Sequence, residues 1–327
     1  MSKKYKKAFG LGLTSFIRRC YKGMWLVLSI PLVVVLRGIS PLLTIRFAKV
    51  QTDRLGHMST IEVYLSEQDL GLRPKRTFDI FYFYPIPSII SNQQVFKMWQ
   101  QNVYFIPLVH IAYFAERINR LLPGYEKHIV RINTLLNDEK YLKISSGSVP
   151  QSYMCTPVHV SSTFLSTKAH LQFSDQEEQY GQEQLQKMGI PKNMPFICFH
   201  ARDSAYLDQL QPDRDWSYHD YRDATIQNYI LAAEEIAQRG VFALRMGTVS
   251  EKYIETSSEK VIDYSKNFHS DFMDLYLAKE CHFLIASNSG IYSLPLFFRK
   301  PTIIPYIIDF SDIPAWSGKD LFILKKF

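Results

Sequence analysis

The sequence predicts an α/β protein in which short strands alternate with helices and pair in parallel. Two observations support this class. Apolar runs of strand length recur along the chain, separated by segments with apolar residues at helical spacing. Several of these runs lead directly into polar clusters, which is typical of the carboxyl ends of parallel strands, where such sheets bind ligands. The chain has 327 residues, enough for two domains of about 100–200 residues each.

Residues 1–41 form a basic and hydrophobic segment that we expect to contact a membrane. Ten of the 38 Lys and Arg residues precede the first acidic residue, Asp53, which leaves 28 basic residues against 31 acidic ones in the rest of the chain. The net charge of +7 therefore belongs to the N-terminus. Nucleic-acid-binding proteins usually carry positive charge on the folded domain, so we expect no nucleic-acid partner and favour an anionic membrane surface.

The apolar run at residues 24–36 determines how this segment meets the membrane. It has 13 residues, fewer than the about 20 that a spanning helix needs, and no small-x-small cleavage site follows it. We therefore predict a peripheral or monotopic attachment to the cytoplasmic face of the inner membrane. A marginal tilted span and an unusually hydrophobic core helix are the alternatives.

Residues 42–185 are predicted to form the first α/β domain. The expected strands are residues 42–50, 78–84 and 102–108, and the expected helices are residues 111–122 and 174–189. The second domain, residues 186–327, has the more regular alternation. Its expected strands are residues 196–200, 241–247, 261–265, 282–290 and 301–306, and its expected helices are residues 224–240, 271–280 and 291–300. This alternation indicates a doubly wound sheet with ligands bound at the carboxyl ends of its strands.

Three polar clusters follow predicted strands and contain the candidate site residues. They are Asp53, Arg54, Gly56 and His57; His200, Arg202, Asp203 and Ser204; and Ser287, Asn288, Ser289 and Gly290. The third cluster combines hydroxyl groups with a glycine at the start of a predicted helix. That pattern suits a bound phosphate and is also found in plain helix caps.

Two arginines and a histidine at strand ends have two interpretations each. The planar guanidinium of Arg202 can hold a diphosphate, or it can pair with Asp203 or another carboxylate. Arg245 ends another predicted strand and is a second candidate for phosphate, with a structural role as the alternative. His200 either donates to a phosphate or supports the side chains around it.

No metal and no organic cofactor is expected. Asp213 and Asp215 have the DxD spacing that metal-dependent sugar transferases use, but they lie in a polar loop and so short a pattern recurs by chance. The four cysteines have no metal-binding spacing. Cys198 and Cys281 lie in or beside apolar runs and are expected to be buried. The sequence patterns of P-loop proteins, zinc proteases and α/β-hydrolases are absent.

The chain resembles a family of bacterial surface-polysaccharide glycosyltransferases in four stretches: DRLGHM, FICFHARDSAYL, YRDATIQNYILAAEEIAQRGVFALRMG and LIASNSGIYSLPLFFRKPTIIP. That family has RIGHL-like and FHARD motifs, is of the GT-B type, and is distantly similar to fucosyltransferases with a His-x-Arg signature. The resemblance spans residues 45–325 and is strongest in the second domain.

This resemblance implies a GT-B-like fold with two Rossmann-like domains facing across a cleft. The first domain would bind the acceptor, either a growing surface glycan or a lipid-linked acceptor, and the second would bind a nucleotide sugar. Arg202 would hold the donor diphosphate with His200 nearby. The third cluster would cap a phosphate or the ribose, and the turn at residues 54–57 would face the cleft from the first domain.

The reaction implied is a metal-independent transfer in which Arg202 stabilises the leaving diphosphate. Asp203 and His57 are the candidate bases for the acceptor hydroxyl. The chain departs from the family pattern at Asp223, where that pattern has asparagine, and members of the family are expected to continue beyond Phe327. The alternatives are a non-catalytic membrane-associated protein of the GT-B fold and a sugar-nucleotide epimerase.

Overall fold

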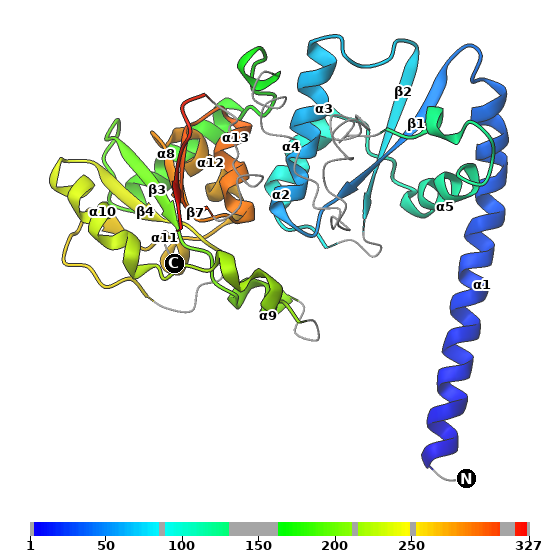
Figure 1. Ribbon diagram of the computed structural model, residues 1–327, viewed down its shortest axis with the longest axis horizontal. Coiled ribbons are helices and arrows are strands. Elements are labelled where there is room, and N and C mark those ends of the chain that lie inside the picture. Colours follow the sequence, from blue (N-terminus) through cyan, green and yellow to red (C-terminus); the bar gives the residue numbers. More distant parts are fainter. Residues whose placement is uncertain are drawn as a thin grey trace. The chain divides into compact units, whose positions relative to one another are not determined.

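The structure is a computed structural model that describes residues 3–84, 89–130, 163–210, 215–248, 253–307 and 318–325. Contacts between residues divide the chain into two compact units. Unit 1 comprises Met1–Gln51, Arg73–Ile89 and Val103–Arg131, and unit 2 comprises Thr52–Leu72, Ile90–Asn102 and Ile132–Phe327. Each unit contains a parallel sheet with helices packed against it (Figure 1), so the predicted α/β class is confirmed.

This division differs from the domain boundary that the sequence predicts between residues 185 and 186. Thr52–Leu72 and Ile90–Asn102, both in the predicted first domain, pack with the C-terminal half. The second of these segments contains α4 (Gln93–Asn102), whose buried Trp99 meets Phe297 edge to face at 5.6 Å between ring centroids. The polar cluster around Arg54 therefore belongs to the same unit as His200.

Unit 1 is built on two parallel strands, β1 (Thr44–Gln51) and β2 (Thr77–Tyr84), which pair in register along their whole length. Single bridges extend this sheet on both sides, from Phe47 to Ile129 and from Phe81 to Phe105. The strand expected at residues 102–108 is present only as the second of these bridges. The expected helix that follows it is α5 (Val109–Asn119), and η1 (Tyr125–His128) comes next.

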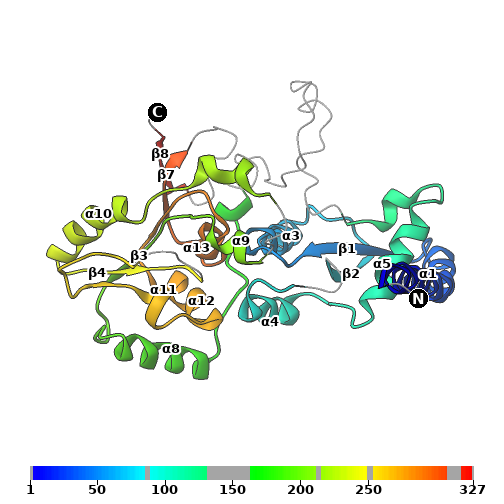
Figure 2. The same cartoon turned by 90° about the horizontal axis from the view of Figure 1, so that it is seen from below.

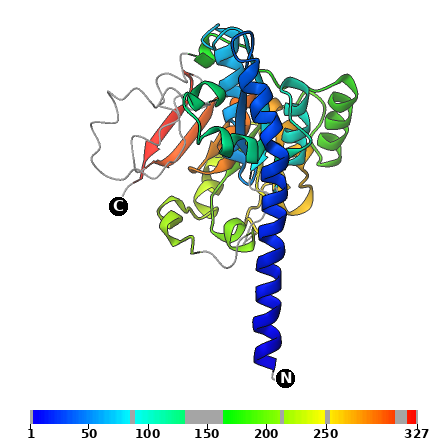
Figure 3. The ribbon, with the colours of Figure 1, turned by 90° about the vertical axis from the view of Figure 1, so that its right-hand side faces the viewer.

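The N-terminal segment is one continuous helix, α1 (Lys3–Gly38), although Pro31 lies inside it (Figure 3). Its C-terminal half runs beside α5 in the same direction. Near one end of this contact, Trp25 stacks on His110 with 5.1 Å between ring centroids. Near the other end, Arg37 Nε donates to Asn119 Oδ1 at 2.9 Å. The helix therefore buries one face against α5.

The opposite face of α1 is apolar and exposed. Val33 and Leu36 enter the core of unit 1. The apolar side chains of α1 that are exposed instead are Met24, Leu26, Val27, Leu28, Ile30, Val34 and Val35. By length and composition, Arg19–Gly38 is capable of crossing a membrane.

Unit 2 contains a six-stranded sheet in the order β5-β4-β3-β6-β7-β8, and every pair of neighbours is parallel. The strands are β3 (Phe196–His200), β4 (Phe242–Arg245), β5 (Val261–Ile262), β6 (Leu284–Ala286), β7 (Thr302–Ile307) and β8 (Leu321–Leu324). Counted along the chain, this order is third, second, first, fourth, fifth and sixth, which is the order of a doubly wound dinucleotide-binding fold. Sequence patterns predicted the first five strands and missed β8.

Helices cover both faces of this sheet (Figure 2). On one face, Ile197 and Phe199 pack against α10 (Gln227–Gln238). On the other face, the Sγ atom of Cys198 lies 3.9 Å from the Leu277 carbonyl in α12 (Asp271–Glu280), and α8 (Asp175–Lys187) packs beyond. Successive residues of β3 thus point to opposite helical layers, so both layers depend on this one buried strand.

The shorter elements differ more from the sequence prediction. They are α2 (Leu55–Met58), α3 (Thr60–Asp69), α9 (Ala205–Leu210), η3 (Ser217–Arg222), α11 (Tyr264–Asn267), η4 (Gly290–Tyr292) and α13 (Ser293–Phe297). The helix expected at residues 291–300 is the 3-10 turn η4 followed by the short helix α13. Pro295 has no N–H group to bond the Ile291 carbonyl, so the regular helix α13 begins only after Ile291, with Pro295 in its first turn. The helix at α8 is confirmed, with a capping box formed by Ser174 and Glu177.

A histidine between two carboxylates joins α3 to the C-terminal half of unit 2. His170 Nδ1 lies 3.0 Å from Glu62 Oε1, and its Nε2 lies 3.1 Å from Asp69 Oδ2. Arg299 Nη2 also pairs with Glu62 Oε1 at 2.6 Å. Burial alone would lower the pKa of His170, but Glu62 and Asp69 outweigh it, so the pKa is raised above its ordinary value.

We expect His170→Gln to remove a pH-dependent part of the stability. Because the folded-state pKa is raised, the stabilisation by the imidazolium is complete below its unfolded value of about 6.5 and is lost as pH rises through the folded-state pKa. The effect should be on the order of 1 kcal/mol or less, since Asp69 is half exposed. Urea unfolding between pH 5 and pH 9 would measure it, with the exposed His282→Gln as the control. Parallel pH profiles for the wild type and His170→Gln would contradict this assignment.

Candidate functional site

The site lies in unit 2 at the carboxyl ends of β3 and β6, where the strand order reverses. Chain segments that leave these two strands diverge, and doubly wound sheets bind ligands in the resulting crevice. Here the Arg202 N–H donates to Ser287 Oγ at 2.7 Å, and the Ser287 N–H donates to the His200 carbonyl at 3.3 Å. Two of the three predicted clusters are therefore brought together. The fully buried Ser287 hydroxyl ties the two strand ends.

His200 is held as a neutral imidazole. Its Nδ1 lies 3.0 Å from the Met246 carbonyl, which can only accept, so Nδ1 carries the proton. Burial, followed by the positive charges of Arg245 and Arg202, lowers the pKa of His200 to about 4 despite this hydrogen bond. The remaining nitrogen, Nε2, is then an acceptor. In this state Nε2 can accept a hydrogen bond from a bound hydroxyl, and a role of His200 toward phosphate stays a prediction.

A cavity of about 280 Å³ opens beside these strand ends. Its lining residues are Ala201, Arg202, Asp203, Ser204, Asp223, Ala224, Thr225, Ile226 and Arg245. Two arginines and two aspartates therefore line one small polar space. Its volume is slightly below the about 300–1,000 Å³ of pockets for drug-sized ligands, which suits part of a nucleotide such as its phosphates.

Arg202 is only 8% exposed and forms an ion pair with Asp223. The Ala224 N–H donates to the Arg202 carbonyl at 2.9 Å, which fixes the two chain segments beside each other. Burial and the neighbouring Arg222 lower the pKa of Arg202, while nearby carboxylates, including that of Asp220, oppose the shift. A guanidinium stays protonated in proteins, so Arg202 is a cation held in place by a carboxylate.

Arg245 is held in a second and more deeply buried ion pair. Its Nη1 lies 3.1 Å from Asp263 Oδ2, and both side chains are less than a tenth exposed. Ser265 Oγ donates to Asp263 Oδ1 at 2.7 Å. Arg245 thus has the structural role that the sequence left open, while it also lines the cavity.

The first predicted cluster packs on the third. A Cβ atom added to Gly290 would lie 3.2 Å from the Gly56 nitrogen, closer than nearly all real contacts of this kind. The Arg54 guanidinium lies over the Trp216 ring at 4.9 Å, and His57 Nδ1 lies 3.5 Å from Asp53 Oδ1. All three clusters are therefore neighbours within unit 2.

Asp53 is ionised beside His57. Burial alone would raise the pKa of Asp53, but the neighbouring His57 and Arg54 outweigh it, so the pKa lies below its ordinary value. Tyr206 lies near the same carboxylate, and its pKa is raised, first by burial and then by Asp53 and Asp271.

Ser289 and Gly290 start a shorter helix than the sequence suggested. Ser289 is the N-cap and Gly290 the first residue of the 3-10 turn η4, whose few aligned peptides give a weaker dipole than a long helix would. The Ser289 hydroxyl is buried and has no hydrogen-bond partner among the described residues. It is therefore the side chain of this cluster with unused hydrogen-bonding capacity.

The two candidate bases occupy different parts of the site. Asp203 lines the cavity next to Arg202, whereas His57 lies beside Asp53. Within the described ranges, no hydrogen bond or ion pair joins Asp203 to His57. Their catalytic roles stay predictions. Sequence reasoning missed Asp263, although its position directly after a strand-like run, in VIDYS, was a usable signal.

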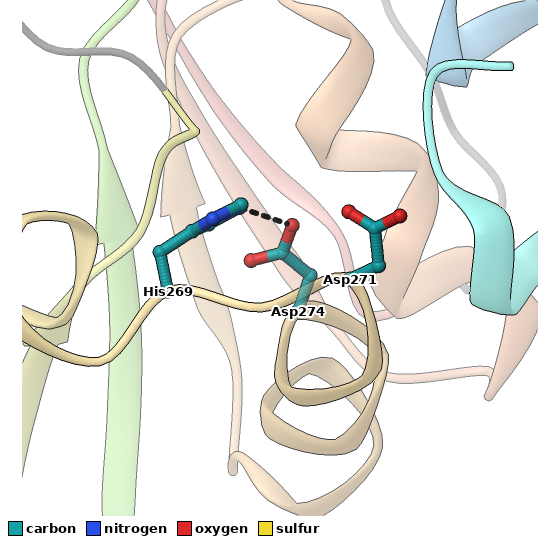
Figure 4. A group of neighbouring side chains, drawn as sticks. All are labelled: His269, Asp271 and Asp274. Atoms are coloured by element: carbon teal, nitrogen blue, oxygen red, sulfur yellow. Dashed lines mark hydrogen bonds and ion pairs between the residues drawn. The ribbon is translucent and has the colours of Figure 1, made fainter.

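One group of possible metal ligands, His269, Asp271 and Asp274, lies at the start of α12 (Figure 4). Each carboxylate already has a protein donor. His269 Nε2 lies 3.2 Å from Asp274 Oδ2, the Tyr264 hydroxyl donates to Asp274 Oδ1 at 2.9 Å, and the Gln93 N–H donates to Asp271 Oδ2 at 2.7 Å. These hydrogen bonds explain why the three side chains lie together at the start of α12. In the DxD pattern, Asp213 lies outside the described residues.

The chain matches no protein-family model and no curated protein. Among solved structures, it is similar to a family 9 glycosyl transferase from Veillonella parvula, with 10% identity over 86% of each chain and a TM-score of 0.49. It is also similar to ADP-heptose lps heptosyltransferase II from E. coli, with 12% identity over 85% of this chain and 90% of that chain and a TM-score of 0.46. At these scores, the function has to be argued from the site itself.

Two serines of the third cluster should respond differently to removal of the hydroxyl. Ser287→Ala leaves the Arg202 N–H buried without an acceptor, which should lower the free energy of unfolding by about 1–3 kcal/mol. Ser289→Ala removes a hydroxyl without a described partner, and we expect a change within about 0.5 kcal/mol. Urea unfolding of both variants would measure this difference. Equal losses would show that Ser287 does not tie the strand ends.

Proposed function

We propose that the protein is a glycosyltransferase of the GT-B type that moves a sugar from a nucleotide-sugar donor to a growing surface glycan or a lipid-linked acceptor. The main support for this proposal is the cavity at the reversal of strand order, which is lined by Arg202 and Arg245. Nucleotides bind at such points in doubly wound sheets, and guanidinium groups match phosphate geometry. The stretches that resemble surface-polysaccharide glycosyltransferases contain all nine lining residues, which supports the same conclusion.

In the proposed reaction, the bond from the anomeric carbon to the diphosphate oxygen breaks while the acceptor oxygen bonds to that carbon. Negative charge develops on the departing diphosphate. Arg202 and Arg245 are held at the cavity by their backbone and carboxylate contacts, so they can stabilise this charge with little reorganisation. Ser289 can donate its free hydroxyl to a phosphate. We propose that this set acts without a divalent metal.

The acceptor hydroxyl must give its proton to a base within hydrogen-bond reach. We propose two candidates. Asp203 lies on the cavity wall beside Arg202. His57 has the ionised Asp53 at 3.5 Å from Nδ1, which can orient the ring so that Nε2 takes the proton. His200, with Nε2 as an acceptor, is suited to hold a hydroxyl of the donor.

Removal of the Arg202 side chain should abolish most of the nucleotide affinity. Calorimetric titration of the purified protein with GDP, UDP, CMP and ADP should find one nucleotide that binds with micromolar affinity. Arg202→Ala should weaken it by between about tenfold and a hundredfold, as expected for a lost charge-assisted hydrogen bond of about 1.5–3 kcal/mol. The matched control is Arg239→Ala, which removes an exposed arginine paired with Glu235 on α10.

Three results would change the proposal. Binding that survives Arg202→Ala would place the nucleotide elsewhere. Absence of binding by all four nucleotides would rule out a nucleotide-sugar donor. Conversion of the donor sugar without an acceptor would indicate an epimerase, and binding without any turnover would indicate a non-catalytic protein.

We also propose that α1 attaches unit 1 to the cytoplasmic face of the inner membrane while lying in the plane of the interface. Its apolar face is exposed, and the N-terminal segment is strongly basic. A span through Arg19–Gly38 would carry α5 into the hydrocarbon, because the two helices lie side by side there. Glu116 of α5 pairs with Arg120 and with the Tyr82 hydroxyl of β2, and burying these polar groups in lipid would be costly.

Charges placed on the exposed face of α1 should prevent attachment. Vesicles containing anionic phospholipid should sediment the wild type, and alkaline carbonate should release it. Val27→Asp combined with Val34→Asp should weaken binding at least about tenfold, since each buried valine contributes about 1.5–3 kcal/mol. Leu231→Asp, on a still more exposed leucine of α10, is the control. Binding that resists carbonate would indicate a transmembrane span. Unchanged binding by the double variant would show that this face of α1 does not contact the membrane.

A further inference from the structure

The charges that line the cavity balance one another. Arg202 pairs with Asp223, and Arg245 pairs with Asp263. Asp203 adds a further carboxylate to the lining. A diphosphate that enters this space therefore does not meet two uncompensated cations. It has to compete with a carboxylate that already neutralises a guanidinium.

The two ion pairs are not equally able to open. Both partners of the Arg245–Asp263 pair are buried, and Asp263 also accepts from Ser265 Oγ. Breaking that pair would leave two buried charges without partners. The carboxylate of Asp223 is 29% exposed and faces the cavity, whereas Arg202 is 10% exposed. Of the two carboxylates, Asp223 is therefore the one that can turn toward water.

The backbone at Asp223 is fixed, so its side chain has to move alone. The Asp223 N–H donates to the Asp220 carbonyl at 2.9 Å, and the next residue, Ala224, donates to the Arg202 carbonyl. A change of side-chain rotamer would move the carboxylate away from the guanidinium while the backbone stays in place. No rearrangement of β3 or η3 is needed.

We propose that Asp223 is an internal competitor for the anion position on Arg202: the incoming diphosphate exchanges with this carboxylate, which thereby sets the affinity of the site. The identity of the ligand as a nucleoside diphosphate rests on the proposed function. The exchange itself requires only an anion with phosphoryl oxygens. Asp223 acts through Arg202, so it tunes binding and takes no part in bond breaking.

The test is a calorimetric titration with inorganic pyrophosphate at about 0.15 M salt, where exposed charges are screened beyond about 8 Å. Asp223→Asn keeps the size of the side chain and removes its charge. We expect it to bind pyrophosphate at least about tenfold more tightly than the wild type. Glu235→Gln is the matched control, because it removes the same charge from an exposed side chain on α10 whose ion-pair partner is Arg239. It should change affinity by less than about threefold.

A second arm tests whether the exchange occurs on Arg202. In an Arg202→Ala background, Asp223→Asn should give no gain in pyrophosphate affinity. Affinity that is unchanged or weaker in Asp223→Asn, undetectable in both proteins, or equally improved without Arg202 would overturn the proposal. Asp223→Ser serves as a second neutral variant if Asp223→Asn does not fold.

Nucleotide titrations separate this inference from the proposed function. If pyrophosphate binding tightens in Asp223→Asn while GDP, UDP, CMP and ADP all fail to bind, the anion exchange stands and the nucleotide-sugar donor does not. If a nucleotide binds through Arg202 and Asp223→Asn does not tighten it, the donor site stands and the internal competitor does not.

Discussion

The reversal of strand order between β3 and β6 is the constraint on which the candidate site depends. At that point two adjacent strand ends are continued by chain segments that separate, which leaves polar backbone groups near a crevice. The hydrogen bond from the Arg202 N–H to Ser287 Oγ satisfies one of these groups and fixes the separation of the two ends. His200, on the same strand end, is fixed in turn by the Met246 carbonyl after β4. The positions of the side chains at the site follow from the sheet topology.

Electrostatic compensation explains why the cavity is not simply positive. A guanidinium taken out of water loses hydration, and an unpaired one would destabilise the folded chain by several kcal/mol. Arg202 and Arg245 therefore each have a carboxylate beside them. The same carboxylates reduce the attraction of the site for an anion. Stability of the fold and affinity for a charged ligand thus place opposite demands on Asp223.

Sequence patterns predicted the parts of the fold that depend on local periodicity. The strand at residues 196–200 and the capped helix at α8 follow directly from an apolar run and from a serine three residues before a glutamate. The polar cluster after the strand at residues 196–200 also located one wall of the cavity, Arg202, Asp203 and Ser204. The pairing of Arg202 with Asp223, and the packing of Gly56 on Gly290, arise from contacts between distant segments. No local pattern contains that information, and the exposed strand β8 lacked the buried character that identifies its neighbours.

The interleaving of the two units has a consequence for how the chain acquires its structure. Thr52–Leu72 leaves the ribosome early, yet it belongs to unit 2 and makes contacts such as Arg299 to Ser66, 233 residues apart in sequence. Closing so long a loop is entropically costly and slows folding. Unit 1, whose last segment ends at Arg131, can form while most of unit 2 is still unsynthesised. The turn that carries Arg54 and His57 packs on Gly290, so it can reach its place in the site only after that residue has been synthesised.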